Sequence, residues 1–235
     1  MLAELIDKII TLKRPEIIKL HDEREMVLAG YHEARIPYPD ALKIHNLTGI
    51  VDFPSIPESW GEKFVHVEDF DKVFLYLCKH GEYNQRVALV SAIARPCNFK
   101  FGQRYPLEEF IIALHGMFQD TNDSKYLFDL VGGIRVDDNT NFIDDGAGQQ
   151  ITAARGVSSL KEKVLIKNPV CLQPFRTFND VRQPISEFVF RYHRDDRMGV
   201  TCSLHECDGE AWKQEAIQAI KAFFVEKLPD VPVIA

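Results

Sequence analysis

Residues 168–212 read NPVCLQPFRTFNDVRQPISEFVFRYHRDDRMGVTCSLHECDGEAW, and this stretch decides the fold that we expect. It contains two apolar runs of strand character, Glu187 to His193 and Val200 to Glu206. It leads into a helix predicted over about residues 210–228, with Asp208 as its expected N-cap. Strands and helices that follow each other in blocks, rather than as alternating βαβ units, are typical of an α+β fold.

The rest of the chain predicts the same class, with mainly antiparallel sheets. The clearest helix is expected over residues 106–119, near the middle of the chain, because its apolar residues form one stripe. A second, short helix is expected from an Asp123 cap to Gly132 and Gly133. The further expected elements are strands at 64–67, 73–77, 87–94, 140–143, 149–154 and 164–166, a strand or short helix at 47–53, and an edge strand at 231–234.

The N-terminal region differs in character from the rest. Residues 2–29 have apolar residues at helical spacing, interrupted by Pro15, and predict an amphipathic helix. We therefore expect a helical arm over residues 1–40 and an α+β domain over residues 41–235. The arm would pack either on the domain or on another subunit.

Composition limits the class of protein. The chain has 235 residues, 46% hydrophobic and 27% charged, which is sufficient for a packed core. The net charge of −7 argues against general binding to a phosphate backbone. Five widely spaced cysteines predict a reducing, cytoplasmic location, and no apolar run approaches the length of a membrane span.

Arginines are most concentrated in the stretch quoted above. Their guanidinium groups suit phosphates and carboxylates. The alternative is internal pairing, because nearly every arginine has an acid close by. The arginines are Arg176, Arg182, Arg191, Arg194 and Arg197, and the acids are Asp180, Glu187, Asp195 and Asp196. Within the same stretch, residues 177–182 lie between Pro174 and Pro184 and predict a rigid excursion, either a sheet-edge crossover or a subunit contact.

Two groups of residues resemble metal ligands. Asp144 and Asp145, with Asp137 and Asp138 nearby, offer oxygen ligands, although Asp144-Asp145-Gly146 also suits a hairpin turn. The second group consists of His193, Cys202, His205 and Cys207. Alternation along one strand would place Cys202 opposite the other ligands of that strand, so we expect it to be a core thiol and His205 to lie on the open side.

No nucleophile, phosphate-loop or dinucleotide motif occurs in the sequence. We therefore expect no cofactor, and a binding protein rather than an enzyme.

Four segments resemble a family of uncharacterised early-region proteins of tailed phages and prophages of Gram-positive bacteria. They are residues 99–123, 141–156, 165–191 and 203–224, so the resemblance extends from about residue 45 to the end. It implies a virus-encoded protein of the host cytoplasm, from a gene near those for recombination and replication. The family has two glycines after the aspartate that precedes the last helix, where this chain has Gly209 and Glu210.

Three functional hypotheses follow. The first is a non-enzymatic phage protein, a homo-oligomer, that binds a host protein or sequesters a small anionic, nucleotide-like ligand in counter-defence. Its ligand residues would be Arg176, Arg182 and Arg191, with Tyr192 as a stacking surface. The second is an accessory protein of phage recombination or replication, associated with single-stranded DNA or a DNA-bound partner. The third is a metal-dependent hydrolase that uses Asp144 and Asp145.

Overall fold

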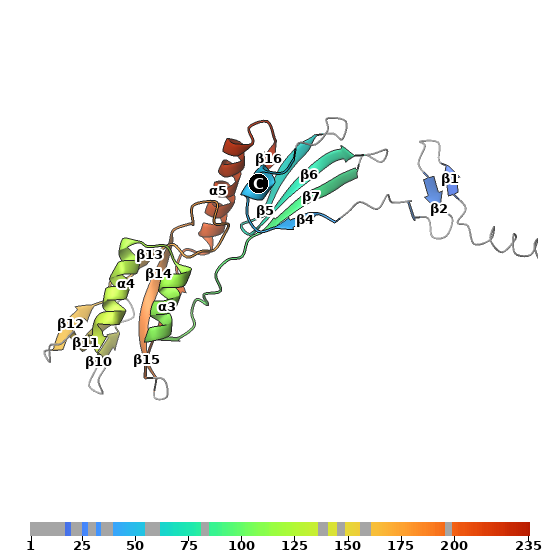
Figure 1. Cartoon of the computed structure of the whole chain (residues 1–235). Coiled ribbons are helices and arrows are strands. Elements are labelled where there is room, and N and C mark those ends of the chain that lie inside the picture. Colours follow the sequence, from blue (N-terminus) through green and yellow to red (C-terminus); the bar gives the residue numbers. More distant parts are fainter. Residues whose placement is uncertain are drawn as a thin grey trace, which may run out of the picture.

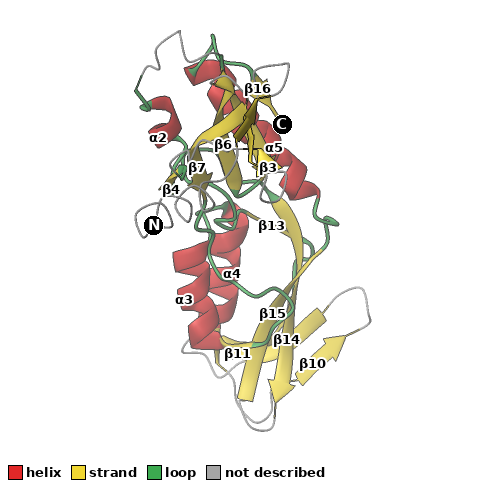
Figure 2. Cartoon of the chain, turned by 90° about the vertical axis from the view of Figure 1, so that its right-hand side faces the viewer, coloured by secondary structure: helices red, strands yellow, loops and turns green. Residues whose placement is uncertain are grey.

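The protein has the predicted α+β fold, with mainly antiparallel sheets. The computed structural model describes residues 17–19, 25–27, 32–33, 40–54, 62–80, 85–135, 141–144, 149–155, 161–195 and 199–235. Residues 40 onwards build two halves, each with its own hydrophobic core, and Figures 1 and 2 show one half above the other.

The first half is built on a five-stranded sheet of order β16-β5-β6-β7-β4. Its strands are β4 (Leu42–Ile44), β5 (Lys63–Asp69), β6 (Lys72–His80), β7 (Gln85–Ile93) and β16 (Val233–Ile234). The three central strands are antiparallel, whereas the edge strands β4 and β16 run parallel to β7 and β5. Helix α5 (Ala211–Lys227) lies along one face, and the short helix α2 (Thr48–Val51) contacts β7.

Side-chain alternation explains why α5 covers this face of the sheet. On β6, Val73 and Leu75 are 0% and 2% exposed and belong to the first core. Ile220 and Phe224 of α5 are fully buried in the same core. Successive strand residues point to opposite sides, so Phe74 and Tyr76 point away from α5.

The second half contains a four-stranded sheet of order β13-β14-β15-β8. Its strands are β8 (Tyr105–Pro106), β13 (Val170–Leu172), β14 (Ser186–Asp195) and β15 (Gly199–Glu206). Helices α3 (Leu107–Met117) and α4 (Asn122–Gly133) lie side by side and share the core of this sheet (Figure 2). A further sheet contains β9 (Ile134–Arg135), β10 (Asn141–Asp144), β11 (Gln149–Arg155) and β12 (Lys161–Leu165), and β10 with β11 forms the predicted hairpin.

The chain enters the first half twice. It leaves after β7, builds the second half from β8 to β15, and then returns with α5 and β16. The first core therefore needs Ile220 and Phe224, which follow Leu75 by more than a hundred residues in sequence. Strands β5, β6 and β7 therefore cannot complete the first core until α5 returns from the second half.

The predicted excursion between Pro174 and Pro184 is organised by the side chain of Gln183, which is 1% exposed. Its Oε1 accepts hydrogen bonds from the backbone N–H groups of Arg176 and Thr177, at 2.8 and 3.1 Å. Its Nε2 donates to the carbonyl of Phe178 at 2.9 Å. One buried amide thus satisfies backbone groups that have no sheet partner.

The same excursion joins the two halves. Phe178 is 1% exposed and lies in the first core, and the Thr177 hydroxyl donates to the carbonyl of Phe70. Asp180 accepts the backbone N–H groups of Leu47 and Thr48, at 3.0 and 3.1 Å, just where α2 begins. These hydrogen bonds hold the pKa of Asp180 below its ordinary value, although burial opposes them. Contacts within the chain therefore account for the shape of the excursion.

The predicted N-terminal helix is wrong at two places. Ile17–Lys19 (β1) and Glu25–Val27 (β2) are strands, and with His32–Glu33 (β3) they form a three-stranded antiparallel sheet. Ile17, Ile18 and Val27 are β-branched and favour extended backbone, which the apolar spacing alone did not reveal. The predicted helix over residues 2–16 lies outside the described residues.

Two predicted helix caps are also wrong. Helix α4 begins at Asn122, and Thr121 is its cap, because the Thr121 hydroxyl accepts the Ser124 N–H at 3.0 Å. At α5 the residue before the helix is Glu210, in the left-handed region at φ 68°. Asp208 instead accepts the Glu210 N–H through Oδ1 at 3.2 Å. Glycine is the residue that adopts this conformation most readily, so Glu210 is an unusual residue at this position.

Among the helices in the described part of the chain, none is long and apolar enough to cross a membrane.

We predict that Gln183→Met destabilises the protein by about 2–4 kcal/mol, because the apolar side chain leaves buried backbone groups without partners. Urea unfolding monitored by circular dichroism measures this. The neighbouring Arg182 is exposed, so Arg182→Met should change the stability by less than about 0.5 kcal/mol. Equal effects of the two substitutions would contradict the role given to Gln183.

Candidate functional site

The side of the five-stranded sheet that points away from α5 carries a cluster of aromatic rings. Register places Phe64 beside Tyr76, and His66 beside Phe74. The ring centroids of Phe64 and Tyr76 are 5.3 Å apart, and those of Phe74 and Tyr76 are 5.4 Å apart. The rings of Phe74, Tyr76 and His66 are half-buried, whereas Phe64 is 9% exposed. We call this side, together with the charged residues described next, the open face.

Cationic side chains flank the rings of the open face. The Lys72 ammonium lies 5.1 Å from the centroid of the Phe74 ring, and the Arg86 guanidinium lies 4.8 Å from that of Tyr76. Such cation–π contacts hold a charge over a ring while leaving its other hydrogen-bond donors available. Lys43 joins the same face, because both Lys43 and Phe74 are in register with Ser91.

The open face carries charged side chains of both signs. Lys43, Lys72 and Arg86 lie on it together with Glu68 and Asp69, since Asp69 is in register with Lys72. Glu68 pairs with Lys72 at 2.6 Å, and this hydrogen bond raises the pKa of the lysine. Both side chains are more than 40% exposed, so water screens the pair. The cations that lie directly beside the rings are suited to an anionic partner.

Sequence reasoning located these strands but missed the open face. The signal is the alternation of Val73, Leu75 and Leu77 with Phe74 and Tyr76, which assigns aliphatic residues to one side and rings to the other.

Arg176, one of the predicted ligand residues, is buried and surrounded by the chain itself. Arg176 is 5% exposed, and its guanidinium lies 4.7 Å from the ring of Phe101, 5.1 Å from that of Phe188 and 4.5 Å from that of Trp212. Its Nη2 lies 2.7 Å from Glu206 Oε1. Burial lowers the pKa of Arg176, while Glu206 opposes the shift. Arg176 is therefore paired within the chain, but with Glu206 rather than with one of the four acids expected from the sequence.

The other predicted ligand residues do not converge on one site. Tyr192, the predicted stacking surface, is 2% exposed and packs edge-on against Phe190. Burial raises the pKa of its hydroxyl. Arg191, next to Tyr192 on β14, points to the opposite side of the sheet, where it is in register with Ser203. Arg182 is exposed on the excursion.

The candidate metal ligands are separated as alternation predicts. Cys202 is fully buried in the second core, where burial raises the pKa of its thiol. On the other side of β15, the Ser203 hydroxyl lies 2.8 Å from His193 Nε2 and 2.9 Å from His205 Nε2. No cluster of three metal-binding side chains occurs among the residues that the structure describes. The side chain of Asp144 and the whole of Asp145 lie outside them.

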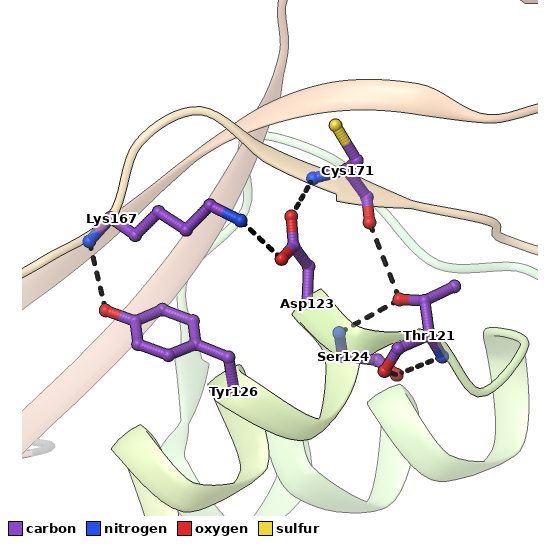
Figure 3. Close-up of polar contacts among 6 residues, drawn as sticks. All are labelled: Thr121, Asp123, Ser124, Tyr126, Lys167 and Cys171. Atoms are coloured by element: carbon purple, nitrogen blue, oxygen red, sulfur yellow. Dashed lines mark hydrogen bonds and ion pairs between the residues drawn. The ribbon is translucent and has the colours of Figure 1, made fainter.

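A carboxylate with a lowered pKa at the start of α4 has a structural role (Figure 3). Asp123 accepts the Cys171 N–H at 2.8 Å and pairs with Lys167 Nζ at 2.5 Å. Next to this pair, the Tyr126 hydroxyl accepts the Lys167 N–H at 3.0 Å. Burial alone would raise the pKa of Asp123. The hydrogen bonds from Cys171 and Lys167 outweigh this effect, so the pKa lies below its ordinary value. Asp123 thus attaches α4 to the chain leading into β13.

No protein-family model matches this chain, and no curated protein or solved structure matches it either.

Asp123 should make stability depend on acid pH. Its pKa is lower in the folded state than the ordinary value of 3.8. Its stabilising effect is therefore complete above that value and is lost as the pH falls through the folded-state pKa. We expect Asp123→Asn to lower the free energy of unfolding by about 1 kcal/mol at pH 7 and to flatten its decline below pH 5 (about one unit above the ordinary value).

Urea unfolding at a series of pH values measures both effects. The control is Asp120→Asn, since Asp120 is exposed nearby. A decline as steep in Asp123→Asn as in the unmodified protein would show that another group causes it.

Proposed function

We propose that this protein binds single-stranded nucleic acid on the open face of its five-stranded sheet. The observation that carries the proposal is the cluster of Phe74, Tyr76 and His66 with Lys72 and Arg86 beside it. Unpaired bases stack on aromatic side chains, and basic residues contact the phosphates between them.

The geometry of a sheet favours this ligand over a duplex. Neighbouring strands lie about 4.8 Å apart, so the rings on β5 and β6 lie close enough together to contact successive bases. A base in a duplex is already stacked on both sides and is inaccessible to them. Each stacked base contributes about 1–3 kcal/mol, so a few rings provide useful affinity without many cations.

This reading develops the second of our sequence hypotheses, that of an accessory protein of phage recombination or replication. The implied position of the gene agrees with it. The net charge of −7 argued against nucleic acid, but Lys72 and Arg86 lie directly beside the rings of the open face. In this role the protein would bind a short segment of single-stranded nucleic acid during phage recombination or replication.

The first sequence hypothesis, a protein that sequesters a small anionic ligand, stays a prediction. Its anionic ligand was to bind at Arg176, Arg182, Arg191 and Tyr192, of which Arg176 and Tyr192 are buried. Binding of a host protein and homo-oligomer formation stay predictions.

We predict that Tyr76→Leu weakens binding of a fluorescein-labelled oligo(dT) by about 5- to 100-fold, the loss expected for one stacked base. Tyr76→Phe keeps the ring and should bind like the unmodified protein. Fluorescence anisotropy at low salt measures both affinities, and circular dichroism verifies the fold. If the Tyr76→Leu and Tyr76→Phe variants bind the oligonucleotide equally well, stacking on Tyr76 does not contribute to binding.

The cations of the open face should determine the salt dependence of binding. For single strands, each lost phosphate contact reduces the slope of log affinity against log salt by about 0.7. We therefore expect Lys72→Ala with Arg86→Ala to reduce the slope by about 1.4. The matched control is Lys125→Ala with Lys227→Ala, which removes two exposed cations from α4 and α5. Equal reductions in the two double variants would place the strand elsewhere.

A further inference from the structure

A cavity of about 300 Å³ lies at the junction of the two halves. Three segments contribute to it: Arg95 and Cys97 after β7, Gly116 in the last turn of α3, and Phe175 and Asn179 in the excursion. Small-molecule sites start at about this volume and occur preferentially between domains. The volume is that of a site for a small ligand.

Backbone hydrogen bonds hold the walls of the cavity together. The Cys97 N–H donates to the Phe175 carbonyl at 2.8 Å, and the Phe175 N–H donates to the Met117 carbonyl at 2.9 Å. The second bond also satisfies one of the carbonyls at the end of α3, which reduces the negative potential there. The cavity is thus preformed.

Arg95 is the charged residue among those that line the cavity, and it is held in place. His45 donates from Nδ1 to the carbonyl of Ile93 at 2.9 Å, which makes its Nε2 an acceptor. Arg95 Nη2 donates to this Nε2 at 2.7 Å. In the part of the chain that the structure describes, no carboxylate forms an ion pair with Arg95, so its remaining donors can meet an anion.

Gly116 leaves part of the cavity open. A Cβ atom added at Gly116 would meet no other atom within 4 Å. The side chain of a larger residue would therefore extend into space that a ligand can use. Asn179, exposed on the opposite segment, adds an amide that can donate to or accept from a ligand.

We propose that this cavity binds the phosphate monoester of one nucleotide, with Arg95 as its anion-binding residue. A planar guanidinium matches two phosphate oxygens at once, and the volume accommodates little more than one nucleotide. The phosphate belongs either to a free nucleotide or to the terminal nucleotide of a strand. The site does not depend on the open face, and it moves the nucleotide-like ligand expected from the sequence to residues that sequence reasoning missed.

Isothermal titration calorimetry with AMP tests the site, with inorganic phosphate as a second probe. We expect AMP to bind and Arg95→Gln to weaken it about tenfold or more, since hydrogen bonds to a charged group are lost. Arg95→Lys should retain part of the affinity because it keeps the charge. Gly116→Leu should abolish AMP binding without lowering the melting temperature, because leucine favours a helix more than glycine does.

Matched controls separate this proposal from the function proposed above. Gly132 is an exposed glycine near the end of α4, so Gly132→Leu should bind AMP normally. Tyr76→Leu, which weakens oligonucleotide binding, should also leave AMP binding unchanged. The cavity proposal is overturned if AMP does not bind, or if neither Arg95→Gln nor Gly116→Leu weakens it, whatever the open face does.

A comparison of two oligonucleotides identifies the source of the phosphate. If a 5′-phosphorylated strand binds more tightly than the same strand without phosphate, and Arg95→Gln removes the difference, the cavity receives a strand end. If both strands bind alike while AMP binding still depends on Arg95, the ligand is a free nucleotide.

Discussion

The guanidinium of Arg176 is enclosed by rings from three separate parts of the chain, and the union of the two halves depends on this contact. Phe101 and Phe188 belong to the second half, whereas Trp212 begins α5 of the first half. A desolvated cation–π contact contributes about 2 kcal/mol or more. Glu206 compensates the buried charge at 2.7 Å, so the guanidinium does not remain an isolated ion.

Gln183 gives this contact its geometry. The amide of Gln183 hydrogen-bonds the backbone at Arg176 and at Phe178. These bonds fix the directions in which the two side chains leave the excursion. One of these side chains enters the junction and the other enters the first core. Asp180, between them and Gln183 in sequence, holds the start of α2. A single short loop therefore positions the junction, a core residue and a helix.

Both proposed sites follow from this arrangement. Because α5 returns to cover one side of the five-stranded sheet, Phe74 and Tyr76 on the other side meet solvent. The excursion also forms one wall of the cavity, through Phe175 and Asn179, while Arg95 stands on another. The two sites thus lie on parts of the chain whose positions the junction determines, and they offer different chemistry: aromatic rings in one case and a guanidinium beside an open depression in the other.

Local periodicity by itself determined most elements after residue 40, including the stripe of α3 and the alternation that turns Cys202 into the core, because these patterns depend on neighbours in sequence. It failed at Ile17 and Ile18, where β-branched side chains and pairing with the next strand, β2, outweigh apolar spacing. Only the tertiary structure decided that Arg176 is buried and that Arg95 lines a cavity. Local sequence patterns do not distinguish a buried arginine from an exposed one, because burial depends on which distant segments fold against the side chain.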